Sequence, residues 1–289
     1  MRTSSPRNLF VALFAFACLI PAPASAAEKN SPGLTATWSK NYLTIKGPGL
    51  PEEGIRTNYI EAFCRPGSTD RDWGKTVIPH RTQLVSLSDD GRTIKLRSEL
   101  ADGVIVSHVI TVGRDELDFR LVATNPTKKD SLVDWAQPCT RVGKFTGAGS
   151  ADARVLYPKY IRKCFIYLDG KLTRLPTKPW ADKARYIPGQ VYVPKGVNRN
   201  DVNPRPLSKL VPSNGLTGCY SADEKLILGI AWEPYQEIFQ GVIACMHSDF
   251  RIGGLKAGET KKIHGKMYVV PADAEKLRKR YEKDFPEQK

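Results

Sequence analysis

The fold class is decided by the stretch Leu117–Gly147, LDFRLVATNPTKKDSLVDWAQPCTRVGKFTG. Its first residues, Leu117 to Leu121, alternate between apolar and charged side chains, which is the pattern of a strand with one buried face. A turn at Asn125-Pro126-Thr127 separates this run from a second one, which carries Trp135 and Gln137. The stretch therefore predicts a hydrophobic strand joined to a polar, aromatic-bearing strand.

The same pattern continues on the N-terminal side of this stretch. Thr82–Ser88, Thr93–Leu100 and Val104–Val112 are rich in β-branched residues, and Asp90-Gly91 and Asp102-Gly103 separate them. An Asp-Gly pair between alternating apolar runs is a strong hairpin signal. We therefore expect an antiparallel meander that ends in the strand beginning at Leu117.

The remaining segments extend the β pattern to most of the chain. A short helix is expected at Ala274–Lys283, with Asp273 as its N-cap. Antiparallel sheets bury their apolar faces against each other, and no repeat indicates a propeller, so we predict an all-β antiparallel sandwich. The other expected strands are two within Leu34–Ile45, Asn58–Phe63, Lys163–Leu168, Thr217–Ser221, Leu226–Trp232, Gly241–Met246 and Lys261–Val270.

The N-terminus has the pattern of a secretory signal peptide. Arg2 and Arg7 form a basic region, Leu9–Ile20 is apolar, and Ala24-Ser25-Ala26 is a small-residue cleavage site. We expect residues 1–26 to be removed and the protein to be secreted or periplasmic. The apolar run is too short for stable membrane insertion. Residues 27–289 are expected to form a single β-sandwich domain with a long proline-rich loop at about 176–212.

The charge balance is basic. The formal net charge is +14, and loss of Arg2 and Arg7 leaves +12 for the mature chain. Such a balance fits nucleic acid, an anionic surface or an anionic polysaccharide, and an exported address argues against nucleic acid. A solvated basic surface without a specific partner is the alternative.

The cysteines do not indicate a metal site. Cys18 leaves with the signal peptide, and an odd number of thiols remains in an oxidising compartment, so at least one stays unpaired. CxxC, HExxH, GxSxG, Walker and GxGxxG patterns are absent from the sequence, so neither a metal nor a cofactor is expected. The disulfide pairing stays open among Cys64, Cys139, Cys164, Cys219 and Cys245.

A polar loop supplies the first candidate binding residues. Arg65, Asp70, Arg71, Asp72 and Trp73 combine charged groups, which hydrogen-bond sugar hydroxyls, with an indole that packs on a pyranose ring. The alternative is a surface loop closed by local ion pairs of small energetic value.

The polar run after the turn supplies a second cluster. Trp135, Gln137 and Arg141 share one face of the expected strand, so they predict one wall of a ligand site. The alternative is an amphipathic strand with a solvated polar face.

A third cluster follows the apolar run Leu226–Ala231. Glu233 comes just past a buried strand, where burial raises the pKa of a carboxyl group and suits it to acid–base catalysis; Gln236 follows as a binding residue. Otherwise Glu233 is a loop residue or an ion-pair partner. His80 and His247 lie near these clusters in the sequence, and we include His247 as a catalytic and His80 as a binding candidate.

Two segments resemble the galactose mutarotase-like (aldose epimerase) group. Asp118–Thr127 is similar to that group's strand and "TN" turn, and Phe250, Leu255 and Gly258-Glu259, followed by a strand to Tyr268, resemble its C-terminal ending. The resemblance implies a β-supersandwich with a carbohydrate site on its concave face.

The resemblance also implies roles for individual residues. The sugar-holding arginine falls at Arg65 or Arg71, and the glutamate base at Glu233. The catalytic histidine position falls at about Gln137, and glutamine has no group that titrates near neutral pH. His247 or His80 would then have to supply the proton.

Three functional hypotheses follow from the sequence. The first is an exported carbohydrate-binding protein with a mutarotase-like concave site that is not a competent aldose epimerase. The second is a carbohydrate-active enzyme, epimerase/isomerase-like or lyase-like, with Glu233 as its base. The third is a non-catalytic module of the cell envelope that binds anionic polysaccharide. The sugar, any reaction and the oligomeric state stay open.

Overall fold

The computed structural model describes residues 33–67, 72–149, 159–177, 191–202, 207–241 and 243–288. All of them belong to one compact unit, Pro32–Lys289. The expected signal peptide, Asp70, Arg71 and much of the proline-rich loop lie outside the described residues.

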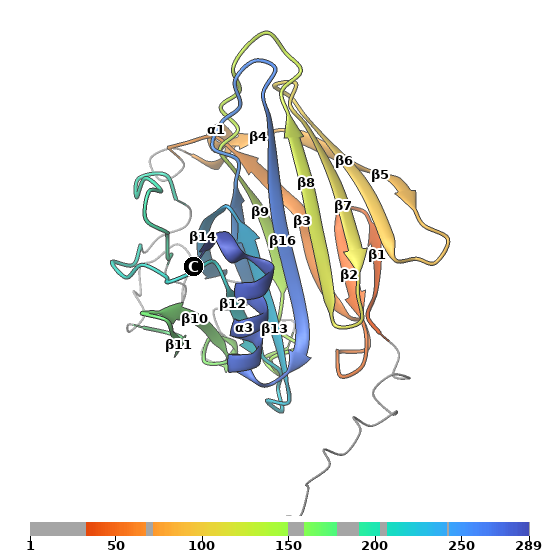
Figure 1. Cartoon of the computed structure of the whole chain (residues 1–289), viewed down its shortest axis with the longest axis vertical. Coiled ribbons are helices and arrows are strands. Elements are labelled where there is room, and N and C mark those ends of the chain that lie inside the picture. The colour runs from red at the N-terminus through yellow and green to blue at the C-terminus, as the bar shows by residue number, and fades with distance from the viewer. Residues whose placement is uncertain are drawn as a thin grey trace, which may run out of the picture. The chain divides into compact units, whose positions relative to one another are not determined.

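Within the described residues the strands form two antiparallel sheets (Figure 1). Sheet A has seven strands, and β4 (Val77–Ile78) pairs with its third strand at one end. The order of the other strands of sheet A is β1 (Thr35–Ser39), β2 (Tyr42–Lys46), β3 (Ile55–Cys64), β9 (Trp135–Arg141), β15 (Cys245–Arg251) and β14 (Tyr235–Gly241).

Sheet B has nine strands among the described residues, and it contains the meander predicted from the Asp-Gly turns. The last strand of the meander pairs with the long C-terminal strand, β16, which places the two segments of the family resemblance side by side. The order is β11 (Lys171–Arg174), β10 (Cys164–Leu168), β12 (Thr217–Tyr220), β13 (Leu226–Glu233), β16 (Thr260–Pro271), β8 (Glu116–Thr124), β7 (Ile105–Val112), β6 (Thr93–Leu100) and β5 (His80–Leu87).

The main hydrophobic core lies between the two sheets. Phe63 and Phe250 of sheet A and Phe119 and Ile230 of sheet B belong to one buried cluster. The alternation predicted for β8 holds, since Leu117, Phe119 and Leu121 are buried and the residues between them are more exposed. The prediction of an antiparallel all-β sandwich with a short C-terminal helix is confirmed.

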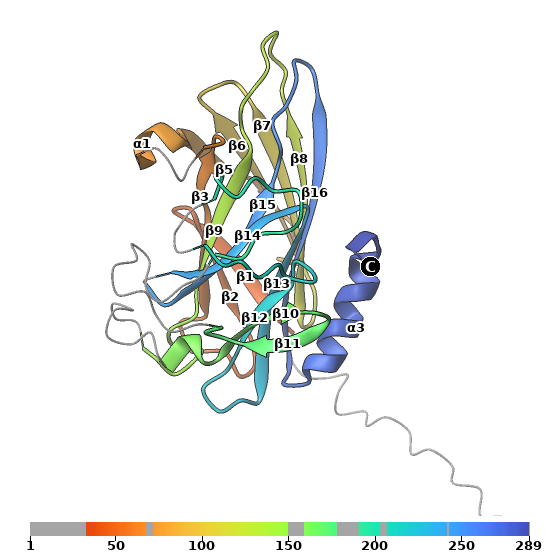
Figure 2. The same ribbon diagram turned by 90° about the vertical axis from the view of Figure 1, so that its left-hand side faces the viewer.

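The helices lie at the margins of the sandwich. Asp72 caps α1 (Trp73–Thr76), and Asp273 caps α3 (Ala274–Asp284) as predicted, before a 3-10 turn, η2 (Pro286–Gln288). Leu277 and Tyr281 of α3 pack on the outer face of sheet B in a second hydrophobic cluster (Figure 2). No helix among the described residues is long and apolar enough to cross a membrane.

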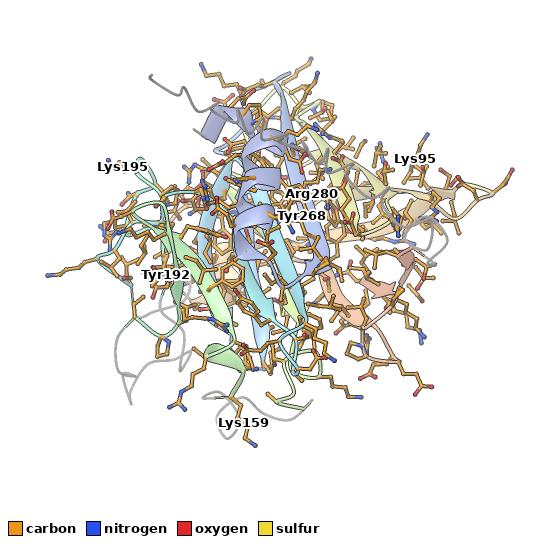
Figure 3. The ribbon with its side chains drawn as sticks, turned by 60° about the horizontal axis from the view of Figure 1, so that its bottom comes forward. Lys95, Lys159, Tyr192, Lys195, Tyr268 and Arg280 are labelled. Carbon is orange, nitrogen blue, oxygen red and sulfur yellow. The ribbon has the colours of Figure 1, made fainter. Side chains whose placement is uncertain are left out.

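A cation and an aromatic ring also hold α3 on sheet B. The guanidinium carbon of Arg280 lies 5.3 Å from the centre of the Tyr268 ring on β16 (Figure 3). The same guanidinium donates to Asp115 at 2.7 and 2.9 Å. Together with the apolar contacts these interactions fix the C-terminal helix against β16.

The strand prediction near Gly241 is wrong in its bounds. Gly241–Met246 was expected to be one strand, but β14 ends at Gly241 and β15 begins at Cys245. Both strands are buried on both faces, so they lack the alternation that reveals a strand in a sequence. The segment after Glu233, for which no strand was predicted, is an edge strand of sheet A.

Candidate functional site

The outer face of sheet A is polar but buried. Trp135, Gln137 and Cys139 of β9 point away from the core, whereas Ala136 between them belongs to the core cluster. On β15, Met246 and Phe250 face the core, and the alternation of the strand turns Cys245, His247 and Asp249 outward. We call this side the covered face and define it by Trp135, Gln137, Cys139, Cys245, His247 and Asp249, none of which is more than 7% exposed.

Part of the proline-rich loop covers this side of sheet A. Val191, Val193, Val197 and Val202 form a buried cluster with Phe239 of β14. Tyr192 and Ile238 exchange backbone hydrogen bonds of 2.9 and 2.8 Å, which attach the loop to the edge of the sheet. The long loop expected from the sequence is therefore, in its described part, a cover over β14.

A network of polar groups anchors this cover. Asp201 accepts a hydrogen bond from the backbone N–H of Gly67 at 2.8 Å, and Gln236 donates to the Asp201 carbonyl at 2.6 Å. Arg251 pairs with Asp134 at 3.1 Å and also donates to Gln236. Burial and the neighbouring Asp134 carboxyl raise the pKa of Asp201 to about 7.

The covered face contains polar atoms without hydrogen-bond partners. Among the described residues, no hydrogen-bond partner is present for five of them: Trp135 Nε1, Gln137 Oε1, His247 Nδ1 and the two carboxylate oxygens of Asp249. The amide nitrogen of Gln137 is engaged, since it donates to Glu61 at 2.9 Å. Buried polar groups in proteins are almost always paired, so this concentration on one face marks a place for a polar partner.

The acid and base on β15 lie close together. His247 Nδ1 is 3.6 Å from Asp249 Oδ1, and the imidazole stacks on Phe239 with ring centres 4.1 Å apart. Burial raises the pKa of Asp249 to about 7. Burial opposes protonation of His247, but the adjacent Cys139 and Asp249 groups raise its pKa to about 10.

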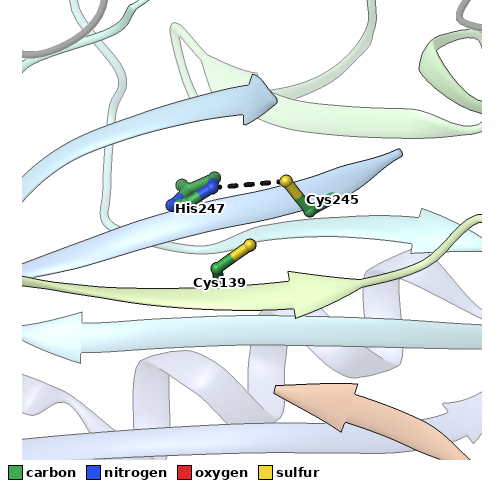
Figure 4. A group of neighbouring side chains, drawn as sticks. All are labelled: Cys139, Cys245 and His247. Carbon is green, nitrogen blue, oxygen red and sulfur yellow. Dashed lines mark hydrogen bonds between the residues drawn. The ribbon is translucent and has the colours of Figure 1, made fainter. Parts of the chain in front are cut away.

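A group of sulfur and nitrogen atoms lies beside this pair. Cys139, Cys245 and His247 offer donor atoms that all lie within 4.8 Å of one another (Figure 4). The Cys245 sulfur is 3.3 Å from His247 Nε2. The five cysteines of the described chain are all free and buried.

The structure brings four of the sequence candidates together. Trp135, Gln137 and His247 lie on the covered face, and Gln236 joins its margin through Asp201. Arg141 lies at the far end of β9, opposite Arg56 and Cys245, where it lines a cavity of about 380 Å³.

The candidates of the Arg65–Trp73 loop are divided between two environments. Trp73 packs against the cluster of Ala62, Cys64 and Trp135, so it borders the covered face. Arg65 donates to the Val77 carbonyl at 2.8 Å, and Asp72 is exposed, where it caps α1 and pairs with Lys75 at 3.5 Å.

His80 and Glu233 lie elsewhere. His80 is 3.2 Å from the Ile60 carbonyl and packs edge-on against Phe63, and burial lowers its pKa. Glu233 ends β13 in sheet B, opposite His264, and lines a cavity of about 680 Å³ between β8, β16 and the end of α3. Burial raises the pKa of Glu233, yet the residue is not brought together with Gln137.

Some residues of the covered face were not singled out from the sequence. Cys245, His247 and Asp249 follow one another at period 2, which is a signal for three side chains on one face of a strand. Only His247 was named as a candidate. Glu61 and Asp201 reach the site through pairings distant in sequence, for which local patterns give no signal.

Comparisons with known proteins find similar solved structures at low sequence identity. No protein-family model and no curated protein matches the chain. Solved structures similar to it include a suggested aldose 1-epimerase from Escherichia coli K12, at 12% identity and a TM-score of 0.41, covering 82% of this chain and 99% of that one. A galactose mutarotase-like protein from Lactobacillus casei has 8% identity and a TM-score of 0.42, with 82% and 100% of the two chains covered. A galactose mutarotase related enzyme from Lactobacillus acidophilus has 7% identity and a TM-score of 0.41, covering 82% and 97%.

Proposed function

We propose that this is an exported protein that binds a neutral carbohydrate at the covered face of sheet A and does not interconvert anomers there. The observation that carries the proposal is the set of unpartnered buried atoms on β9 and β15. The N-terminal pattern of a basic region, an apolar run and a small-residue cleavage site supports export.

The chemistry of these atoms fits hydroxyl groups. Trp135 Nε1 is a donor and needs an acceptor, while Gln137 Oε1 and the Asp249 oxygens accept and need donors. A hydroxyl group both donates and accepts, so adjacent hydroxyls of a sugar satisfy both kinds of atom. Trp73 is only partly buried where it packs beside the fully buried Trp135, and its indole offers apolar surface for a pyranose ring.

The charge of the site favours a neutral sugar over an anionic one. Burial raises the pKa of the Cys64 thiol, and nearby carboxyl groups raise it further through their negative charge. A uronic acid or sulfated sugar would place another negative charge among them, with little water to screen it. The carboxyl groups concerned are those of Glu61, Asp201, Glu237 and Asp249.

The same geometry disfavours mutarotation at this face. An anomer exchange needs an acid and a base on one sugar, and Gln137 has no proton that titrates near neutral pH. Glu233, the expected base, lies in sheet B and lines a different cavity. The face therefore lacks the acid and base expected from the sequence, and its own titrating groups, His247 and Asp249, face each other at 3.6 Å.

Calorimetric titration with neutral monosaccharides, their disaccharides and uronic acids tests the proposal. We expect saturable binding of a neutral sugar, at least tenfold weaker in Trp135→Phe and Gln137→Met. Trp232→Phe is the matched control, because Trp232 Nε1 is also buried and unpartnered but belongs to the core cluster. Absence of binding across the panel, a preference for uronic acids, or equal effects of Trp135→Phe and Trp232→Phe would overturn it.

A second candidate function is catalysis at Glu233, favoured by its raised pKa and by the cavity it shares with His264 and Arg120. Exchange of anomers followed by NMR decides this case. Acceleration that Glu233→Gln abolishes would establish the enzyme; a rate equal to the uncatalysed one would exclude it.

A further inference from the structure

Three soft or borderline metal ligands converge on the covered face, outside the atoms that carry the proposed sugar site. The side chains of Cys139, from β9, and of Cys245 and His247, from β15, point toward one another (Figure 4). Their donor atoms lie within 4.8 Å of one another, and the three residues are 1%, 1% and 3% exposed. Small side-chain rotations would bring all three donor atoms to the ligand distances of zinc, which are about 2.0–2.3 Å.

The histidine is oriented as a metal ligand would be. Its Nε2 faces the Cys245 sulfur at 3.3 Å, and its Nδ1 faces Asp249 at 3.6 Å without a hydrogen-bond partner among the described residues. Metal-bound histidines commonly present their second ring nitrogen to a carboxylate, which fixes the ring and increases its basicity. Stacking on Phe239 holds the ring plane in this direction.

The backbone beside the cluster leaves room for the sulfur. A Cβ atom on Gly241 would lie 2.5 Å from the Cys245 sulfur and 3.4 Å from His247 Nε2. Only glycine at this position lets both donor atoms approach the end of β14 so closely. The donor atoms thus pack closely against the backbone at the end of β14.

We propose that Cys139, Cys245 and His247 bind one zinc ion. Two cysteines and one histidine form a ligand set suited to zinc, and they leave a fourth tetrahedral position for water or a ligand oxygen. Zinc binds the two cysteines as thiolates and the histidine through an unprotonated Nε2, so binding releases the protons of all three groups, and the two thiolates balance the double charge of the metal. Monovalent copper also takes such ligands, but it would leave one net negative charge in a buried site, which is costly.

A disulfide is the competing chemistry, and the strand register disfavours it. Cys245 lies opposite Arg141 of β9, two residues from Cys139, so the two cysteines are diagonal neighbours and not a directly opposed pair. Cys164 and Cys219, in contrast, lie directly opposite each other on β10 and β12. Cys164 and Cys219 supply matched controls. Their thiols are also buried and free, but among the described residues they belong to no three-ligand group with a histidine.

Refolding of the full chain with cobalt as a spectroscopic probe, and then with zinc, tests the site. We expect one metal per chain, with the intense visible bands of tetrahedral cobalt and a thiolate charge-transfer band. Cys139→Ser and Cys245→Ser should each abolish the charge-transfer pattern or halve it, while Cys164→Ser and Cys219→Ser keep both the pattern and the stoichiometry. Asp249→Asn should lower zinc affinity about 10- to 100-fold, as loss of a carboxylate behind a ligating histidine does.

A cysteine variant that misfolds would lose the metal for another reason, so circular dichroism checks the fold of each variant. Asp249→Asn keeps all three zinc ligands and tests the site without removing a thiol. The proposal is overturned if wild-type protein binds no cobalt, if Cys164→Ser or Cys219→Ser removes the bands, or if mass spectrometry finds Cys139 and Cys245 joined as a disulfide. Sugar titration of the metal-free and zinc-loaded protein separates this inference from the proposed function, because either can fail while the other holds.

Discussion

Gln137 donates a hydrogen bond from Nε2 to Oε2 of Glu61, at 2.9 Å, and its own carbonyl oxygen meets no partner among the described residues. The contact fixes which end of the amide faces the covered face. A carbonyl group that accepts hydrogen bonds and does not titrate is therefore turned toward the covered face. The Gln137–Glu61 contact therefore supports the proposal that the covered face binds a sugar without catalysing a reaction.

The Gln137–Glu61 contact predicts a pH-dependent penalty for Gln137→Glu. The variant places two carboxyl groups at hydrogen-bond distance, so we expect it to lose about 1–3 kcal/mol of unfolding free energy at pH 7. The two carboxyl groups raise each other's pKa in the folded state, so the loss should shrink as the pH falls and be largely gone at about pH 4, the ordinary carboxyl pKa. Urea unfolding at both pH values measures it, with Gln137→Met as the uncharged control. Wild-type stability of Gln137→Glu at pH 7 would contradict the contact.

His108 predicts acid sensitivity of the fold. The residue is buried between Tyr59 and Ser98, with ring nitrogens 3.0 and 2.9 Å from their hydroxyls, and burial lowers its pKa to about 3. Below the ordinary pKa of about 6.5 the unfolded chain binds a proton that the folded chain does not. The unfolding free energy should therefore fall by about 1.4 kcal/mol per pH unit between roughly pH 6 and pH 3.

The matched variant for this prediction is His108→Gln, whose amide can also bridge the two hydroxyls but does not titrate. We expect its unfolding free energy to depend less on pH over the same range, as measured by urea unfolding at half-unit steps. Equal pH profiles for the variant and wild type would show that another group causes the acid sensitivity.

Asp201 predicts the opposite pH dependence for the stability of the contact between the proline-rich loop and sheet A. Its folded pKa, about 7, lies above the ordinary value of 3.8, so the folded state prefers the protonated form. The contribution of Asp201 is then fully present below pH 4 and is lost as the pH rises through 7. Asp201→Asn should remove this part of the pH dependence. Hydrogen exchange of Gly67 and Tyr192 amides between pH 5 and 8, corrected for intrinsic rates, would detect it; identical profiles would count against the network.

Trp232 and Gly265 predict the most local stability effect. They lie directly opposite each other on β13 and β16, and a Cβ atom on Gly265 would lie 2.3 Å from the indole. Gly265→Ala should therefore destabilise the protein by about 1–3 kcal/mol through overpacking. Gly74→Ala is the control, since its Cβ would meet only Asp72 at 3.4 Å. Thermal unfolding that does not distinguish the two variants would refute this packing.

The sequence predicted those parts of the fold in which one strand face is buried and the other is not. Leu117 to Leu121 alternate because β8 faces the core on one side, and Asp90-Gly91 and Asp102-Gly103 mark real hairpin turns. The strands β14 and β15 gave no such signal, because both faces of each strand are buried, and the cluster of Val191 and its neighbours covers the outer side of β14.

The candidate site was predictable only where its residues share a strand. Trp135 and Gln137 are two positions apart on β9, so period 2 placed them on one face. Their meeting with His247 depends on the pairing of β9 with β15, and the exclusion of Glu233 depends on β13 joining the other sheet. Neither strand pairing can be predicted from the local sequence.

The central claim, a sugar bound against the covered face, is tested most directly by the indole N–H resonances of the protein. The chain has five tryptophans, and Trp135→Phe and Trp232→Phe assign by difference the two whose buried indole N–H groups meet no partner among the described residues. On addition of the sugar selected by calorimetry, the Trp135 resonance should shift in a saturable way while that of Trp232 stays in place. A saturating sugar that leaves the Trp135 resonance unmoved would contradict the account.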